Sequence, residues 1–231
     1  MQFFLDSLHS AVLLIRDMDP ELLSIVQVSL KVSLSATGLA ALLGVPLGFF
    51  VAMGDFPGRR AVITLLNTLL SVPTVVIGLL VYAFISRQGA LGGLDLLYTQ
   101  KAIVIGQTLL ILPIVAAFTI SALSRVDARY RRTALTLGAN ARQTAFLVLR
   151  EARFGIGAAV VAAFGRAIAE IGVAMMLGGN ARGFTRTMTT AMALEYNKGE
   201  FVLAVALGLI LLGISLGVNI VLNFCQGRLD K

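Results

Sequence analysis

Two residues of opposite charge stand inside an otherwise apolar stretch of this sequence. Arg166 and Glu170 are four positions apart, so on a helix they share one face and can form an ion pair. Ionisable groups in such a stretch are costly, and they usually face the interior of a helix bundle or a water-filled cavity. The spacing therefore permits two interpretations: a pair that lines a path or closes a gate, and a pair that only locks helix packing.

A second group of polar residues follows in the segment 178–200. It combines guanidinium and hydroxyl groups, and both donate hydrogen bonds to oxyanions. The residues concerned are Arg182, Thr185 and Arg186, with Thr187, Thr189, Thr190 and Lys198 nearby. The same side chains also suit contact with a partner protein or simple solvation, and the sequence leaves these three roles open.

Catalytic chemistry finds little support in this composition. There is one cysteine, Cys225, and one histidine, His9, which excludes a disulfide framework and a metal site built from clustered His or Cys. No His or Asp accompanies the ion pair deep in the apolar stretches, and no phosphate-binding loop of the form G-x-x-x-x-G-K-[ST] occurs. We therefore expect no catalytic residues, no metal site and no cofactor bound by this chain.

The elements that must position these residues are membrane-spanning helices. Of the 231 residues, 58% are hydrophobic and 13% are charged, against about 25% charged in soluble domains. Because a helix satisfies its own backbone in lipid and about 20 apolar residues cross the bilayer, we predict an all-α integral membrane protein. It forms a single domain, 1–231, with five spans at about 32–54, 61–86, 102–124, 154–177 and 201–225.

Several smaller features refine this prediction. Pro46, Pro73 and Pro113 fall inside three spans and are expected to kink them. Glycines at 44 and 48 and at 213 and 217 have the spacing that lets membrane helices approach closely. The start of the chain lacks the features of a cleavable signal. Its apolar residues suit either a short surface helix or a loosely ordered leader; these are Phe3, Phe4, Leu8 and Val12.

Basic residues set the expected orientation. Five spans divide the remaining residues into two sets, and one set (53–60, 125–153 and the tail after 227) holds 11 basic and 4 acidic residues. The other set holds 7 of each. The positive-inside rule assigns the first set to the cytoplasm, which places the N-terminus outside and the C-terminus inside. The pI of about 10.2 thus reflects topology, and we expect no nucleic-acid partner.

The loop 125–153 has more internal order than a tether needs. Residues 131–137 favour a short helix, Gly138 is a natural stop, and Asn140 is suited to cap a second helix that runs through Arg150. Apolar residues would give the pair one apolar face among arginines: Ala134, Leu135, Leu137, Phe146 and Leu149. This pattern indicates either docking to a soluble partner or a loop whose arginines only fix topology and touch anionic lipid.

The same loop resembles the EAA loop of the transmembrane subunits of ABC importers. The corresponding positions are Arg132-Thr133-Ala134, Gly138 and Val148–Glu151, with Arg132 in place of the first Glu and Arg150-Glu151 in place of the terminal Leu-Pro. Downstream, FGRAIAEIGVAMMLGGN (164–180) is similar to the Arg-Ala-x-x-Glu-x-Gly segment of oxyanion importers for molybdate, tungstate and sulfate. The stretch TRTMTTAMALEYNKGEF (185–201) most resembles the tungstate permeases.

This resemblance implies the transmembrane domain of a type I ABC importer in a prokaryotic cell membrane. It implies a second copy of the chain, two cytoplasmic ATPase subunits that bind ATP and Mg, and an extracytoplasmic oxyanion-binding protein. Tungstate is the expected cargo, with molybdate or sulfate as the alternative cargo. A stand-alone secondary transporter is the alternative class of protein. The implied ATPase-coupling residues are Arg132, Ala134, Leu135, Leu137, Gly138, Asn140 and Phe146, and the implied path or gate residues are Arg166, Glu170, Arg182, Thr185 and Arg186.

Overall fold

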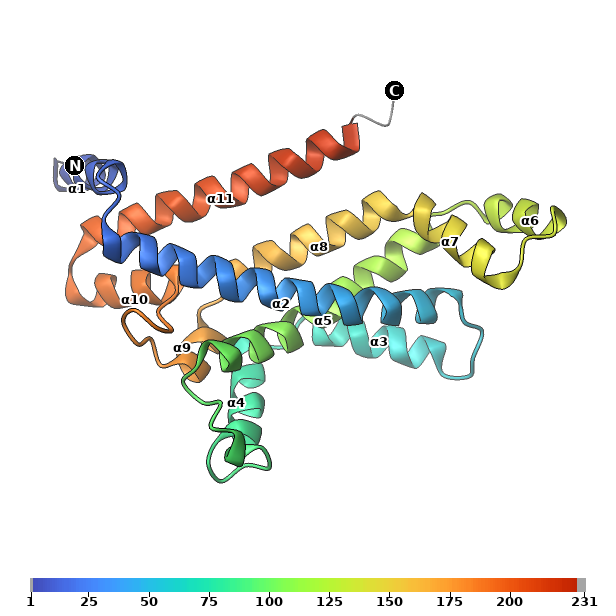
Figure 1. Ribbon diagram of the computed structural model, residues 1–231, viewed down its shortest axis with the longest axis horizontal. Coiled ribbons are helices and arrows are strands. Elements are labelled where there is room, and N and C mark those ends of the chain that lie inside the picture. Colours follow the sequence, from blue (N-terminus) through green and yellow to red (C-terminus); the bar gives the residue numbers. More distant parts are fainter. Residues whose placement is uncertain (1, 228–231) are drawn as a thin grey trace.

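A computed structural model describes the backbone of residues 2–227 and the side chains of residues 7–223. The regular elements of this part are all helical, which confirms the predicted fold class (Figure 1). They are α1 Gln2–Arg16, α2 Pro20–Met53, α3 Arg59–Leu69, α4 Thr74–Ile85, the 3-10 turn η1 Gly92–Leu94, α5 Gln100–Ser124, α6 Ala128–Thr136, α7 Ala141–Glu151, α8 Arg153–Ile168, α9 Gly172–Gly178, α10 Met188–Lys198 and α11 Phe201–Gly227.

The long helix α2 pairs closely with α5 along the middle of the molecule. It begins earlier than the expected span, because Asp19 caps it by accepting hydrogen bonds from the N–H groups of Glu21 and Leu22. A helix of 34 residues measures about 51 Å, so its first turns extend beyond a hydrocarbon core of about 30 Å. Gly44 and Gly48 face α5, where an added Cβ would meet its atoms at 3.0 Å and 2.7 Å. These two glycines thus let the helices pack closely, as their spacing predicts.

The expected span 61–86 is not one continuous helix. It consists of α3 and α4, which meet at a bend of 102°. Pro73 stands at the break as the residue preceding α4, and it has no N–H to continue the hydrogen bonding of α3. The prediction of a kinked but continuous helix was therefore wrong here. Pro46 and Pro113, in contrast, lie inside helices that continue past them.

The expected span 154–177 is broken as well. It comprises α8 and α9, bent by 59° at residues 169–171. The carboxylate of Glu170 accepts a hydrogen bond of 3.1 Å from the N–H of Val173, so this side chain caps the first turn of α9. Three helices, α2, α5 and α11, are long and apolar enough to cross a membrane unbroken, and each bent pair adds one further candidate span.

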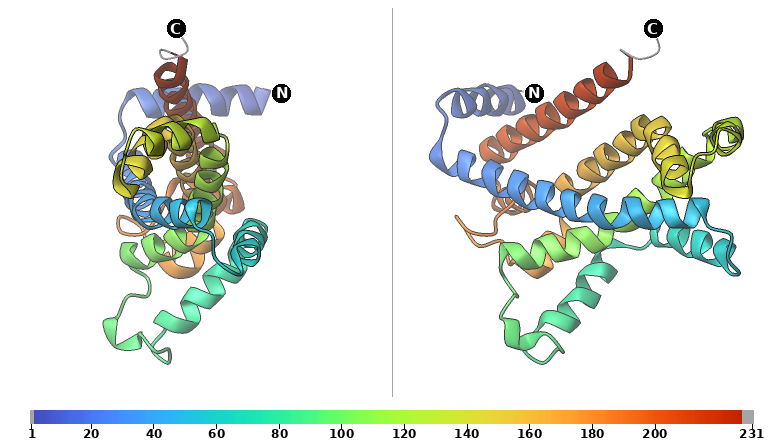
Figure 2. Two further views of the ribbon diagram at one scale, coloured as in Figure 1. Left: turned by 90° about the vertical axis from the view of Figure 1, so that its right-hand side faces the viewer. Right: turned by 45° about the vertical axis from the view of Figure 1, so that its right-hand side comes forward.

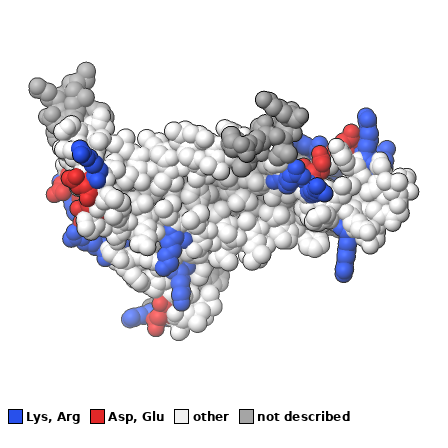
Figure 3. Space-filling view, turned by 45° about the horizontal axis from the view of Figure 1, so that its top comes forward, with Lys and Arg blue, Asp and Glu red and all other residues white. Residues whose placement is uncertain are grey.

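The molecule is elongated, with α2, α5 and α8 running along its length and α4 projecting to one side (Figures 1 and 2). Charged side chains gather at the two ends and on the lower projection of the face shown in Figure 3, and much of the surface between them carries none. The segment 2–16 is the helix α1, and it packs against α11 through the fully buried Ala11. The side chains of Phe3 and Phe4 lie outside the described residues. Around Gly213 and Gly217 an added Cβ would meet no atom within 4 Å, so these glycines face open space.

Candidate functional site

The α6–α7 hairpin, residues 128–151, projects from one end of the bundle (Figure 1). Its first helix begins at Ala128 instead of 131, because the side chain of Asp127 accepts a hydrogen bond from the N–H of Arg129. Gly138 ends it with a backbone φ of +82°, and the N–H of Ala139 bonds to the carbonyl of Ala134 at 2.9 Å. This is the left-handed termination that favours glycine. The predicted stop at Gly138 is confirmed.

The second helix of the hairpin also forms as expected. The side chain of Asn140 accepts from the N–H of Gln143, and the side chain of Gln143 accepts in return from the N–H of Asn140. This reciprocal capping box fixes the start of α7 directly after the turn. The sharp turn therefore holds two short helices in one defined arrangement.

Large apolar side chains on this hairpin point into open space. Leu137 is 81% exposed and Phe146 is 69% exposed, and Leu135 is half exposed. Ala134 is buried inside the hairpin, and Arg132 is exposed beside the apolar residues. Large apolar side chains exposed on a projecting element are typical of a protein–protein contact.

Arg166 and Glu170 do form the ion pair that their spacing predicts. A distance of 2.5 Å joins Arg166 Nη1 to Glu170 Oε2, and the other carboxylate oxygen caps α9. The Glu170 side chain is 2% exposed, so both of its oxygens are engaged inside the fold, whereas the Arg166 side chain keeps 38% exposure. Glu170 thus belongs to the α8–α9 break, and the Arg166 side chain remains partly exposed beside it.

Side chains from other helices satisfy the carbonyl groups at this break. Gln107 on α5 donates to the carbonyl of Ala167 at 3.0 Å, and the hydroxyl of Thr189 on α10 donates to the carbonyl of Glu170 at 2.7 Å. Gln107 is not among the residues that the sequence predicted for the site; it is fully buried, and its Oε1 is unpaired among the described atoms. A lone glutamine within an apolar stretch was the available signal.

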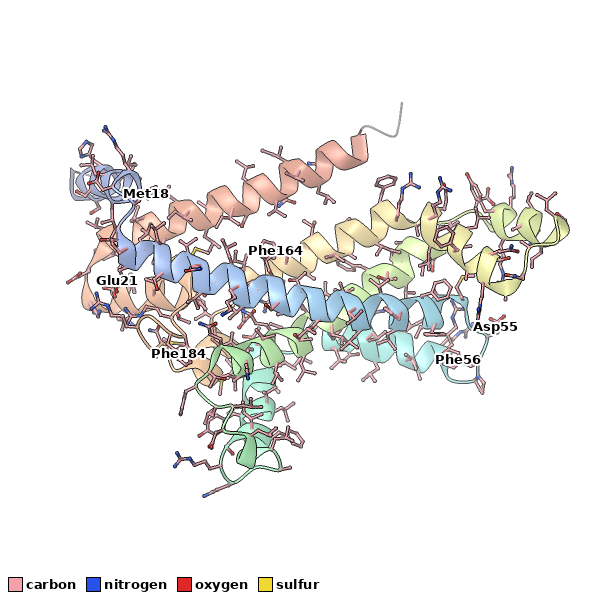
Figure 4. The ribbon with its side chains drawn as sticks, in the orientation of Figure 1. Met18, Glu21, Asp55, Phe56, Phe164 and Phe184 are labelled. Carbon is pink, nitrogen blue, oxygen red and sulfur yellow. The ribbon has the colours of Figure 1, made fainter. Side chains whose placement is uncertain are left out.

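The arginine loop, residues 179–187, joins α9 to α10 at the end of the bundle where α2 begins. Its two arginines converge on one carboxylate, that of Glu21 in the first turn of α2. Arg182 bonds to Glu21 Oε2, and Arg186 Nη1 lies 3.4 Å from Glu21 Oε1. Figure 4 shows Glu21 and Phe184 near this end, and Asp55 and Phe56 at the opposite end. The structure thus brings Arg182 and Arg186 together at Glu21, whereas Arg166 binds a different carboxylate, that of Glu170.

Thr185 supports the arginine loop from inside. It is fully buried, its hydroxyl donates to the carbonyl of Gly178 at 2.6 Å, and it accepts from the N–H of Ala181 at 2.9 Å. The neighbouring hydroxyls are likewise buried and bonded within the fold: Thr187, Thr189 and Thr190. The hydroxyl groups expected to meet an oxyanion are therefore engaged inside the protein, and the guanidinium groups carry the free donors.

The loop is also anchored to two long helices. Gln100 at the start of α5 donates to the carbonyl of Phe184 at 2.6 Å, and Ser29 of α2 accepts from the N–H of Met188 at 2.6 Å. The N–H of Tyr98 bonds to the carbonyl of Leu177, at the end of α9. These contacts hold the arginines in a fixed frame between α2, α5 and the α8–α9 break.

A helical bundle with broken spans and a projecting helix–glycine–helix loop defines a class, the membrane subunits of ABC importers. The chain belongs to the family described as the binding-protein-dependent transport system inner membrane component, whose model matches residues 44–231. It is therefore a permease component of the cell's inner membrane, and a separate subunit hydrolyses ATP. This confirms the resemblance found in the loop 125–153.

Curated relatives narrow the group further. A probable anion ABC transporter permease of Haloferax volcanii is 43% identical, over 86% of this chain and 88% of the relative. The tungstate uptake permease TupB of Peptoclostridium acidaminophilum is 38% identical over 98% and 99%, and TupB of Campylobacter jejuni is 36% identical over 96% and 92%. Among solved structures, a bacterial ABC transporter that imports the acidic polysaccharide alginate matches with a TM-score of 0.74 at 17% identity, covering 96% of this chain and 84% of that one. That likeness shows the fold alone.

Proposed function

We propose that this chain is the membrane permease subunit of an ATP-driven, binding-protein-dependent importer of oxyanions, with tungstate as its cargo. The observation that carries this proposal is the 38% identity to a tungstate uptake permease over nearly the full length of both chains. The two guanidinium groups of the arginine loop agree with an anionic cargo, because charge-assisted hydrogen bonds to oxyanions are strong.

The proposed topology counts each bent helix pair as one span, which gives five spans. The end with the α2–α3 loop and the α6–α7 hairpin then faces the cytoplasm, because it carries the excess of basic residues. The N-terminus lies outside and the C-terminus inside. This orientation places the arginine loop on the outer face, where cargo arrives.

The proposed assembly contains two copies of this chain, two cytoplasmic ATPase subunits that bind ATP and Mg, and an extracytoplasmic oxyanion-binding protein. The α6–α7 hairpin docks onto an ATPase subunit through its exposed Leu137 and Phe146, and Arg132 lies beside this contact. The membrane subunits alternate between an outward-open and an inward-open state, and closure of the ATPase pair shifts the equilibrium between these two states.

The proposed path runs from the arginine loop past the α8–α9 break. Arg182 and Arg186 receive the dianion, and Arg166, whose side chain is partly exposed, meets it at the break. Glu170 restrains Arg166 and holds the start of α9, which makes it a gate residue that does not contact the cargo. Thr185 contributes by fixing the loop.

Uptake by the reconstituted complex tests this function. The four-subunit assembly with its binding protein is placed in proteoliposomes that contain ATP, and uptake of tungstate, molybdate and sulfate is measured in parallel. We expect tungstate uptake that depends on ATP and on the binding protein. Preferred uptake of molybdate or sulfate would identify that anion as the cargo instead of tungstate. Uptake that is driven by an ion gradient without ATP would refute the assignment as an ATP-driven importer.

A further inference from the structure

We propose that the carboxylate of Glu21 occupies an oxyanion site formed by Arg182 and Arg186, so that arriving cargo must displace it. This inference rests on the proposed import of a dianion and identifies the residue that closes the receiving site. Glu21 belongs to α2 and is separated from the arginines by more than 160 positions in the chain. Its side chain reaches across to the arginine loop and bonds to both guanidinium groups.

Charge favours the exchange. Two guanidinium groups share one carboxylate, so these three groups together carry a net charge of +1, while the carboxylates of Asp19 and Glu200 line the pocket beside Glu21. A dianion in place of Glu21 would neutralise both arginines. A monovalent anion would only reproduce the present charge of the three groups, so a dianion gains more from the exchange than a monovalent anion does.

Hydrogen-bond geometry favours the exchange as well. The Arg186 side chain is only 12% exposed, and its contact with Glu21 is long, at 3.4 Å. Its Nε is buried without a partner among the described atoms. A buried guanidinium N–H without an acceptor is unfavourable. Glu21 accepts from Arg186 only through Nη1 among the described atoms, whereas an oxyanion with several oxygen atoms can accept from Nη1 and Nη2 together.

The ion pair between Arg182 and Glu21, which must open first, is weak. Arg182 is 71% exposed, and exposed ion pairs contribute little, so solvent and salt compete with it readily. Glu21 itself keeps 30% exposure and can return to water once it is displaced. The loop stays in place during the exchange because Thr185 and Gln100 hold it independently of Glu21. The site therefore opens by a side-chain movement.

Anion binding to the full chain in lipid nanodiscs, without binding protein or ATPase, tests this proposal. Equilibrium dialysis measures the binding of tungstate, with sulfate and chloride in parallel. Glu21→Gln keeps the size of the side chain but removes the competing charge, and we expect it to tighten tungstate binding by about tenfold and chloride binding by clearly less. Glu200→Gln is the matched control, because Glu200 is an exposed carboxylate that lines the same pocket as Glu21 and no ion pair involves it among the described residues.

A pair of double variants assigns any gain to the site. Glu21→Gln with Arg182→Gln should lose the gain, whereas Glu21→Gln with Arg87→Gln, which has the same net charge, should keep it. Both substituted arginines are exposed, so the fold is retained. Unchanged or weaker tungstate binding by Glu21→Gln, or an equal gain from Glu200→Gln, would overturn the proposal. Tungstate uptake by the wild-type complex is measured separately, so that a failure of this site is distinguished from a failure of the proposed function.

Discussion

Substitution of Gly138 isolates the conformation that the α6–α7 hairpin requires. The residue has a backbone φ of +82°, and an added Cβ would meet no atom within 4 Å, so a side chain costs only the left-handed conformation. That cost is about 1–2 kcal/mol for Ala or Leu and smaller for Asn, which tolerates this region. A change of this size lowers the population of the observed turn by about five- to thirty-fold.

The expected order of ATPase docking is therefore wild type, then Gly138→Asn, then Gly138→Ala and Gly138→Leu. Co-purification of the ATPase subunit and anion-stimulated ATP hydrolysis measure it, with the amount of permease in the membrane unchanged. Gly157→Ala is the matched control, since Gly157 also has open space around it but lies in regular helix α8, where alanine is favourable. Wild-type docking and hydrolysis by Gly138→Leu would refute the reasoning and leave the hairpin as a topological tether.

Three further predictions follow from the membrane-embedded part. The double variant Arg166→Met with Glu170→Gln should assemble and hydrolyse ATP but lose anion uptake. Either single change leaves one uncompensated charge and should lower the yield of folded protein. Normal uptake by the double variant would exclude Arg166 from the path. Gly48→Ala should cost about 1–3 kcal/mol in thermal unfolding, because its Cβ would lie 2.7 Å from α5, while Gly217→Ala should be neutral. Reporter fusions after positions 56 and 140 should be cytoplasmic and those after 92 and 190 external, and a mixed pattern would contradict the proposed orientation.

The sequence predicted those parts of the fold that depend on composition and local chemistry. Apolar length predicted helices, Gly138 and Asn140 predicted the hairpin turn, and the spacing of Gly44 and Gly48 predicted a close helix contact. The break at α3–α4 was missed, because a proline in a membrane helix is compatible with both a kink and a full break. The break at α8–α9 was missed because no proline marks it. There Glu170 caps a new helix, and Gln107 and Thr189 from other helices bond to the carbonyl groups at the break.

The candidate site was predicted only in part, because some of its contacts are local in the sequence and others are long-range. Arg166 and Glu170 meet through local spacing, which a sequence reveals, and Arg182 and Arg186 were found from their chemistry. Glu21 was missed, because nothing in its neighbourhood distinguishes it from other acidic residues at a helix start. Its role depends on a contact across more than 160 positions of the chain. The role of the threonine hydroxyls stayed open between an oxyanion, a partner protein and solvent, because sequence does not tell whether a hydroxyl is buried and already bonded.

The arginine loop and the α8–α9 break are linked by a short chain of hydrogen bonds. Directly after the loop, the N–H of Met188 bonds to Ser29 of α2, and the next residue, Thr189, donates its hydroxyl to the carbonyl of Glu170. Glu170 in turn holds Arg166 and the first turn of α9. Release of Glu21 removes one contact between α2 and the arginine loop, while the bond between Ser29 and Met188 keeps α2 attached to the segment that fixes the break. The proposed receiving site and the proposed gate therefore share one continuous segment that stays anchored during the exchange, so the movement that opens the gate comes from ATPase closure and not from the release of Glu21.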